Sequence, residues 1–132
     1  MSERIASCRC GQLRATASGE PVRLSVCHCL NCKKRSGSAF AVQARWPADQ
    51  VTIAGEARTF TMAGDSGDRA TFHFCPDCGS DVYYVAEAMA DMIAIPLGAF
   101  DDPFFGTPAY SVYEGRKQDW VEIAGEGVEH LD

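Results

Sequence analysis

The 132-residue chain lacks long hydrophobic runs, has only three histidines and carries fewer basic than acidic side chains. No stretch approaches the roughly 18 apolar residues that a membrane-spanning helix needs, so no membrane association is expected. The N-terminal residues also lack the apolar segment of a signal peptide, which predicts a cytoplasmic location. With 12 basic against 18 acidic residues and a formal net charge of −6, the composition argues against nucleic acid as a partner.

The spacing of turn residues predicts an all-β protein with a single domain over residues 1–132. Glycine and proline recur at short intervals, and the segments between them alternate apolar and polar residues, as strands do. In residues 40–46, for example, apolar side chains flank Gln43 and Arg45, which are expected on the opposite face. Further strands are predicted at residues 69–74, 81–85, 92–96 and 120–123. They are expected to pair antiparallel, with one short helical turn at 31–37 that ends at Gly37 and an exposed loop at 64–68.

Seven cysteines are the most informative feature, and they fall into three groups. The groups are Cys8 and Cys10; Cys27, Cys29 and Cys32; and Cys75 and Cys78. An odd number of cysteines in a reducing compartment argues against a disulfide framework. In a strand, a C-x-C pair projects to one face, and a C-x-x-C turn curls around an ion, so both spacings suit chelation. Thiolate-rich sites select zinc, and iron in a four-sulfur site is the main alternative.

Two divisions of the seven ligands are open from spacing alone. The first joins the two C-x-x-C turns, Cys29/Cys32 and Cys75/Cys78, as in a zinc ribbon, and leaves three cysteines unused. The second joins Cys8/Cys10 with Cys75/Cys78 and leaves Cys27, Cys29 and Cys32 together. The second is preferred because four protein ligands close a structural zinc site, whereas three leave a position open for a substrate.

Several other residues near the cysteines are candidates for function. Arg35 could hold a substrate carboxylate, and Ser36 and Ser38 could donate hydrogen bonds to a substrate; a solvated helix face and ordinary turn chemistry are the alternatives. His28 lies between two cysteines and is expected to point away from the metal and pack. His73 is considered as a fourth ligand of the open site, although a structural role is preferred.

At this point the motifs resemble the glutathione-dependent formaldehyde-activating enzyme family, which includes centromere protein V. Residues 27–40 read C-H-C-x-x-C-K-K-x-S-G-S-x-F, flanked by a Cys-x-Cys-Gly motif at 8–11 and a Phe-Cys-x-x-Cys-Gly-Ser motif at 74–80. A Gly-x-Phe-Asp-Asp-Pro motif follows at 98–103. The resemblance covers roughly residues 5–121. One departure is Asp81, where many members have a histidine.

The resemblance implies a β-tent fold of antiparallel sheets with two zinc ions per chain. It assigns Cys8, Cys10, Cys75 and Cys78 to a structural zinc, and Cys27, Cys29 and Cys32 to a second, catalytic zinc with an open position. It further implies a carbon–sulfur lyase that acts on an adduct of an aldehyde and a small thiol, such as S-hydroxymethylglutathione from formaldehyde and glutathione. The alternative is a zinc-stabilised module that binds a protein or small ligand without catalysis. The oligomeric state is left open.

Overall fold

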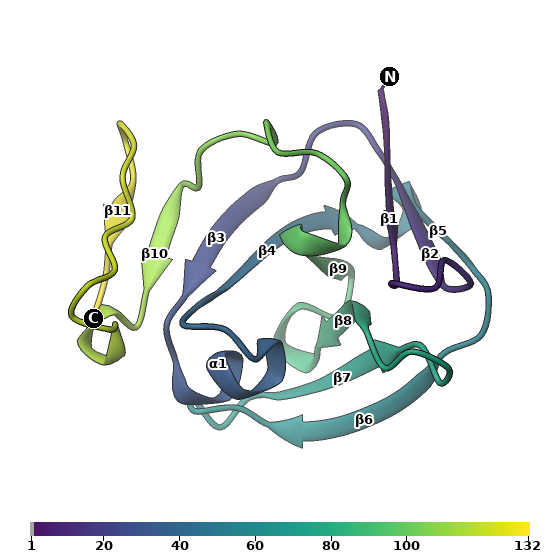
Figure 1. The fold of residues 1–132 in the computed structure, drawn as a ribbon, viewed down its shortest axis with the longest axis horizontal. Helices are drawn as coiled ribbons and strands as arrows, with labels where there is room; N and C mark the ends of the chain where they lie inside the picture. The colour runs from purple at the N-terminus through teal and green to yellow at the C-terminus, as the bar shows by residue number, and fades with distance from the viewer. Residues whose placement is uncertain (1) are drawn as a thin grey trace.

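A computed structural model describes residues 2–132 and contains two β-sheets (Figure 1). The smaller sheet has the order β1-β2-β5 and consists of β1 (Glu3–Ser7), β2 (Arg14–Ser18) and β5 (Val51–Ala54). The larger sheet has eight strands in the order β11-β10-β3-β4-β9-β8-β7-β6. Its strands are β3 (Arg23–Cys27), β4 (Ala41–Pro47), β6 (Arg58–Ala63), β7 (Arg69–Phe74), β8 (Asp81–Ala86), β9 (Met92–Pro96), β10 (Tyr110–Val112) and β11 (Glu129–His130). The prediction of a mainly β protein is confirmed.

Most of the predicted strands form where the alternation of apolar residues placed them. Residues 69–74 form β7, residues 92–96 form β9, and residues 81–85 lie within β8. The prediction at residues 120–123 is wrong, because this segment has no strand pairing. Val121 is buried and Ile123 is half-buried there, while Trp120 is 75% exposed, so the burial alternates as predicted although the backbone does not pair with a strand.

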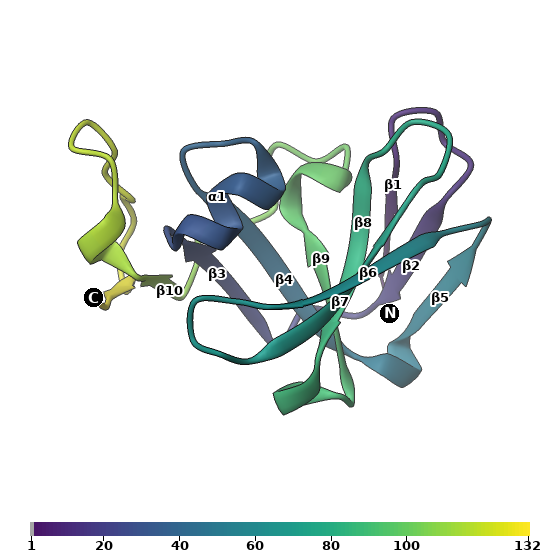
Figure 2. The same cartoon turned by 90° about the horizontal axis from the view of Figure 1, so that it is seen from below.

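The pairing within the larger sheet is antiparallel except at β10. This strand pairs parallel with both β3 and β11, which corrects the expectation of antiparallel pairing throughout. The parallel register is possible because residues 113–128 form a long connection that returns β11 to the same direction as β10. Figure 2 shows this C-terminal segment and the three-stranded sheet on opposite sides of the molecule.

Residues 2–132 contain one α-helix, α1 (Leu30–Ser36), which begins and ends close to the predicted boundaries. At its start, the Cys29 thiol accepts a hydrogen bond from the backbone N–H of Cys32, as an N-cap side chain does. At its end, Gly37 adopts a left-handed conformation with φ 63° and donates to the carbonyl of Lys33. The helix therefore starts at one cysteine and includes another. The described part of the chain also has four short 3₁₀ segments, at Ala48–Gln50 (η1), Glu87–Met89 (η2), Leu97–Ala99 (η3) and Glu114–Arg116 (η4). Within residues 2–132, no helix is long and apolar enough to cross a membrane.

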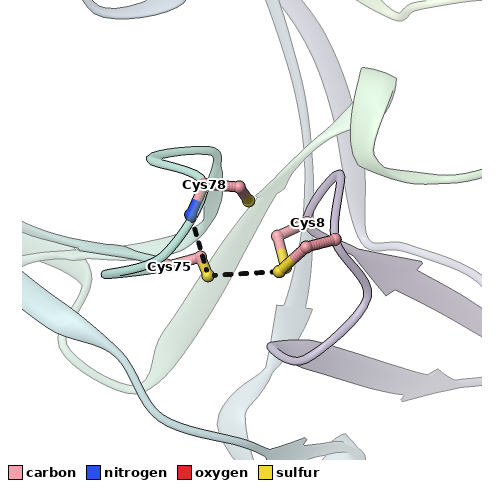
Figure 3. A group of neighbouring side chains, drawn as sticks. Cys8, Cys75 and Cys78 are labelled. Carbon is pink, nitrogen blue, oxygen red and sulfur yellow. Dashed lines mark hydrogen bonds between the residues drawn. The ribbon is translucent and has the colours of Figure 1, made fainter.

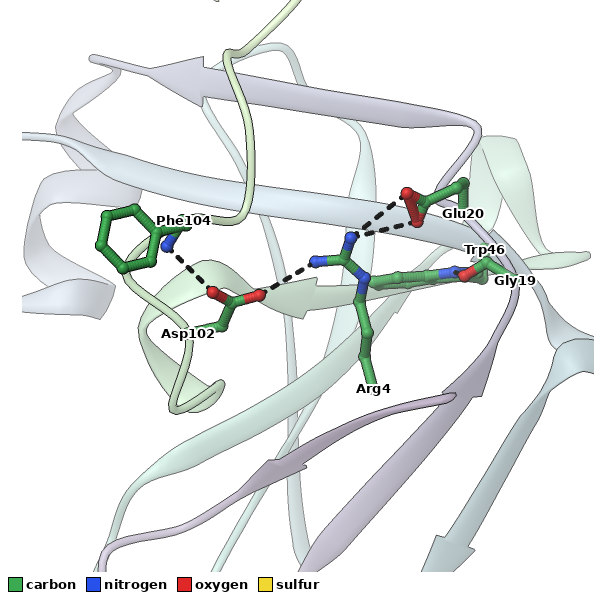
Figure 4. A network of polar contacts seen from close by, with 6 residues as sticks. All are labelled: Arg4, Gly19, Glu20, Trp46, Asp102 and Phe104. Atoms are coloured by element: carbon green, nitrogen blue, oxygen red, sulfur yellow. Dashed lines mark hydrogen bonds and ion pairs between the residues drawn. The ribbon is translucent and has the colours of Figure 1, made fainter. Parts of the chain in front are cut away.

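The core centres on Trp46 of β4, which is fully buried and packs against the rings of Phe100 and Phe105. Its indole N–H donates to the carbonyl of Gly19, 3.0 Å away, so the polar end of the ring is satisfied. Close by, Arg4 on β1 contacts Glu20 at 3.1 Å (Figure 4). The same guanidinium lies 3.4 Å from Asp102 in the loop after η3, which holds that loop against β1. The contact of Asp102 with Arg4 favours a structural role for the Asp101–Asp102–Pro103 segment, as a turn before proline does, over acid–base work by paired carboxylates.

The face of β4 opposite Trp46 is covered as well. Gln43 is only 4% exposed, although it lies on the face opposite Trp46. Arg45 on the same face is half-buried and reaches Tyr84 of β8. This second buried face lies beside the cysteines of α1 and forms part of the candidate site.

Candidate metal centres

The structure gathers four cysteines from two distant segments into one cluster: Cys8, Cys10, Cys75 and Cys78. Figure 3 shows the loop after β1 facing the turn between β7 and β8. The sulfur of Cys10 lies 3.6 Å from that of Cys8 and 3.7 Å from that of Cys75. Tetrahedral zinc with bonds of about 2.3 Å to sulfur requires sulfur atoms about 3.8 Å apart, so the cluster has the dimensions of a four-thiolate zinc site.

Hydrogen-bond donors surround the sulfur atoms of this cluster. The side-chain amide of Gln12 donates to the Cys75 sulfur at 3.0 Å, and the backbone N–H of Asp77 donates at 3.3 Å. Burial opposes ionisation of Cys75, but these and other hydrogen bonds outweigh it and lower the pKa of the thiol. The pKa of Cys78 is lowered to about 5, first by the backbone N–H of Ser80. The donors therefore favour the thiolate form of Cys75 and Cys78, which is the form that a metal requires.

The other three cysteines form a second cluster where β3 meets α1. The sulfur atoms of Cys27, Cys29 and Cys32 lie within 4.8 Å of one another. The structure therefore groups the cysteines as four and three, rather than joining the two C-x-x-C turns. The sulfur of Cys27 donates to that of Cys32, and this hydrogen bond is the main reason why the pKa of Cys32 falls to about 6 and that of Cys27 rises. The positive charge of Arg35 lowers the pKa of Cys32 further.

Neither cluster includes a histidine among residues 2–132. His73 stacks on Tyr83, with ring centroids 4.1 Å apart, instead of approaching the three-cysteine cluster. His28 is fully buried and its Nε2 lies 2.9 Å from the Ser111 hydroxyl, so it packs away from the sulfur atoms. Burial lowers the pKa of His28, which keeps the imidazole neutral. The three-cysteine cluster thus has no fourth His, Cys, Asp or Glu ligand in the part of the chain that the structure describes.

A cavity of about 190 Å³ opens onto the three-cysteine cluster. Its walls come from β3, β4 and α1, from the hairpin between β6 and β7, and from Tyr84 and Tyr113. Tyr113 adopts a left-handed conformation with φ 57°, the only non-glycine residue with positive φ in residues 2–132. Such conformations cost about 1–3 kcal/mol and tend to occur at functional sites.

The cavity is also lined by polar side chains that were not anticipated as site residues, among them Arg23, Gln43 and Arg45. Arg23 shares a face of β3 with Cys27, four residues later, and alternation alone could have identified it. Arg45 lies directly across from Arg23 in the register between β3 and β4. That alignment depends on strand pairing, which local sequence patterns do not reveal.

The predicted substrate-binding residues do not all face this cavity. Arg35 lines it and also lines a larger cleft of about 1150 Å³, on the side of the four-cysteine cluster. Ser36 and Ser38 line only the larger cleft. The Ser36 hydroxyl donates to the carbonyl of Cys32 at 2.8 Å, and the Ser38 hydroxyl accepts from the backbone N–H of Phe40 at 3.4 Å. A substrate that touches both serines would therefore have to occupy the larger cleft.

Comparison with known families agrees with this arrangement. The family model described as "Glutathione-dependent formaldehyde-activating enzyme" matches residues 3–116, a span that contains both cysteine clusters. The chain belongs to the glutathione-dependent formaldehyde-activating enzyme family. A crystal structure of a Rhodobacter sphaeroides protein resembles the fold, with a TM-score of 0.59 and 15% sequence identity over 75% of this chain and 91% of that chain. No curated protein sequence matches the chain closely enough to add to the family assignment.

The geometry of the two cysteine clusters shows where a metal could bind. Both clusters of this formaldehyde-activating enzyme family member have donor sets of sulfur alone. Such sets suit soft metals and are consistent with zinc. The four-cysteine cluster would be closed by its own ligands, whereas the three-cysteine cluster would leave one position facing the cavity.

Proposed function

We propose that the protein binds glutathione or a related small thiol in the 190 Å³ cavity and acts as a zinc-dependent carbon–sulfur lyase on the adduct of that thiol with formaldehyde. Cys27, Cys29 and Cys32 would hold the zinc ion at this site, and the four-cysteine cluster would hold a second, structural ion. The observation that carries the proposal is the cavity itself, because three convergent sulfur atoms line it together with three arginines.

The residues of both clusters fit zinc. Sulfur separations of 3.6 and 3.7 Å in the four-cysteine cluster match tetrahedral thiolate coordination. In the three-cysteine cluster, the lowered pKa of Cys32 makes one thiolate available near neutral pH without a metal. A zinc ion bound there would supply a positive centre that stabilises a substrate thiol as its thiolate.

The proposed reaction is balanced without an oxidant. In the direction of adduct formation, the substrate sulfur attacks the formaldehyde carbon, and the new carbon–sulfur bond forms as the carbonyl π pair moves to oxygen. The proton lost by the thiol ends on that oxygen, which gives a hydroxymethyl thioether. In the lyase direction the same bond breaks and the proton returns to sulfur.

The chain's own residues would orient the substrate. Arg35 lies at the cavity wall with its side chain only 10% exposed, where it can hold a substrate carboxylate. The guanidinium carbon of Arg35 lies 5.0 Å from the ring centroid of the buried Tyr84, and this cation–π contact helps to hold the arginine in place. Ser36 and Ser38 would contact only those parts of a substrate that extend into the larger cleft.

Exchange spectroscopy by NMR would test the activity. With ¹³C-formaldehyde and glutathione, the protein should raise the rate of exchange between free aldehyde and the hydroxymethyl adduct above the spontaneous rate. The variant Cys29→Ser should return exchange to the spontaneous rate while the four-cysteine cluster keeps the protein folded. Glutathione binding without faster exchange would contradict the lyase and favour a zinc-stabilised binding module instead.

A further inference from the structure

The face of the β3–β4 pair that lines the cavity carries two arginines directly opposite each other. Arg23 and Arg45 are register partners in this antiparallel pair. Directly opposed side chains in such pairs have Cβ atoms about 4.5–5.5 Å apart, and like charges at this position destabilise the sheet. Both residues are half-buried, so solvent screens the repulsion only in part.

Neither arginine is neutralised within the described chain. No carboxylate of residues 2–132 lies within 4.0 Å of either guanidinium. Arg45 donates only to the Tyr84 hydroxyl, at 3.3 Å, and Arg23 stacks over the Tyr110 ring at 4.4 Å. The Nε atom of Arg23 is buried and has no hydrogen-bond partner. A buried guanidinium donor without an acceptor is costly, so this end of the cavity is suited to an anion.

A second unsatisfied group lies between the arginines and the sulfur atoms. The Gln43 side chain is only 4% exposed and donates to the Ser25 hydroxyl at 3.4 Å, but its carbonyl oxygen has no partner. Gln43 and Ser25 are themselves register partners, two residues further toward Cys27. An acceptor at this position is suited to a ligand N–H, such as that of an amide.

The acidic residues of the cavity lie elsewhere. Asp65 and Asp68 belong to the hairpin between β6 and β7, and Asp65 is paired with Arg116 and with the backbone N–H of Leu30. Asp81 does not line this cavity, and it pairs with Arg35. The face formed by β3 and β4 therefore keeps its two positive charges.

One face of β3 carries a thiol, a hydroxyl and a guanidinium in succession. On β3, Cys27, Ser25 and Arg23 share one face, and four residues of strand separate the Cα atoms of the first and last by about 13 Å. We infer that Arg23 and Arg45 form a carboxylate site that selects thiols whose carboxylate is separated from the sulfur by an amide, with Gln43 accepting the amide N–H. This inference rests on the proposed function, because it assumes that the ligand sulfur lies at the three-cysteine cluster.

Titration calorimetry with the zinc-loaded protein would test the inference. Arg23→Gln and Arg45→Gln should each weaken glutathione binding by about 10- to 100-fold, as expected for loss of a charge-assisted hydrogen bond. Free cysteine has its carboxylate too close to its sulfur to reach the arginines. It should therefore bind with the same affinity to the wild type and to both arginine variants. Cysteinylglycine and γ-glutamylcysteine each keep one arm of glutathione. If the affinity for cysteinylglycine falls in the arginine variants, the bound group is the glycine carboxylate. If the affinity for γ-glutamylcysteine falls, the bound group is the carboxylate of the glutamyl arm.

Two controls separate a binding role from a structural one. Arg58→Gln removes the same charge from an exposed position on β6 outside the cavity, and it should leave binding unchanged. Because the opposed arginines repel each other, Arg23→Gln and Arg45→Gln should unfold at the same temperature as the wild type or higher. A merely structural role would lower that temperature.

The outcomes distinguish this inference from the proposed function. Glutathione binding that is lost in Cys29→Ser but unchanged in both arginine variants would overturn the carboxylate site and leave the proposed function standing. A glutathione analogue with a methyl group in place of the thiol provides a further test. If the wild type binds this analogue and the arginine variants do not, the carboxylate site is supported and the role of the thiol is contradicted. Failure of the wild-type protein to bind any of these ligands would overturn both.

Discussion

The guanidinium of Arg35 lies 3.8 Å from the carboxylate of Asp81, and this ion pair connects the two cysteine clusters. Each partner follows the last cysteine of its cluster by three residues: Arg35 follows Cys32, and Asp81 follows Cys78. The pair lies at the wall of the larger cleft, with side chains only 10% and 25% exposed.

The ion pair predicts that substitutions of its two partners have different effects on the stability of the fold. Burial raises the pKa of Asp81 although the charge of Arg35 acts to lower it, so the ionised carboxylate costs stability in the folded state. The stability that protonation of Asp81 gives is present at low pH and is lost as the pH rises through its raised pKa. At pH 7, therefore, Asp81→Asn should unfold at the same temperature as the wild type or higher. Arg35→Gln leaves the carboxylate buried without its partner and should cost about 1–3 kcal/mol.

Thermal unfolding of both variants at pH 7 would check this prediction. Arg69→Gln is a matched control, since its pairing with Glu87 is 3.8 Å long and both side chains are more than half exposed. It should change the free energy of unfolding by less than about 1 kcal/mol. An Asp81→Asn variant that is clearly less stable than Arg35→Gln would contradict the conclusion that the ionised Asp81 carboxylate costs stability in the folded state.

The two cysteine clusters should differ in their contribution to folding. Cys75 is fully buried and joins segments that are 65 residues apart, as its contact with Cys10 shows. Zinc binding to structural sites is worth about 10–16 kcal/mol, which exceeds the net stability of most domains. Cys75→Ser should therefore abolish cooperative unfolding, whereas Cys29→Ser should retain it. Metal analysis should give two zinc ions per chain for the wild type and one for Cys29→Ser. Equal loss of structure in Cys75→Ser and Cys29→Ser would contradict the different roles of the two clusters in folding.

Gln12 should tune metal affinity at the four-cysteine cluster. Its side-chain amide donates both to the Cys75 sulfur and to the backbone carbonyl of Glu56. Gln12→Glu keeps the size of the side chain but replaces the donor with a carboxylate oxygen that repels the thiolates. Zinc affinity, measured by competition with a chelator, should fall about 10- to 100-fold. Glu56→Gln, where only the backbone takes part in these bonds, should not change it.

Gly55 should be intolerant of any side chain. It has φ +96°, and a Cβ atom there would overlap the carbonyl oxygen of Gln12. Gly55→Ala therefore combines backbone strain with a clash against the loop that carries Cys8 and Cys10, and should cost about 2–4 kcal/mol. Gly67→Ala is the matched control, with φ +87° but nothing within 4 Å of its Cβ position, and should cost only about 1 kcal/mol. Denaturant unfolding of the two variants would measure the difference, and equal losses would show that the clash is relieved.

The sequence by itself determined the local features of this protein. The alternation at residues 69–74 and 92–96 predicted β7 and β9 because the side-chain period of a strand is a local property. The helix at α1 followed from Gly37, whose left-handed conformation ends it. The three-cysteine cluster was one of the two groupings that spacing allowed, and all of its ligands lie within six consecutive residues.

Tertiary structure alone decided which distant segments meet. Spacing left two divisions of the cysteines open, and only the approach of the β1 loop to the β7–β8 turn brings Cys10 beside Cys75. The alignment of Arg23 with Arg45, the burial of Gln43 and the parallel pairing of β10 likewise depend on strand register. Register is set by the packing of whole sheet faces, and a shift of one residue would turn every side chain to the other face. For this reason the sequence located the sulfur ligands, but the chemistry of the cavity around them emerged only from the fold.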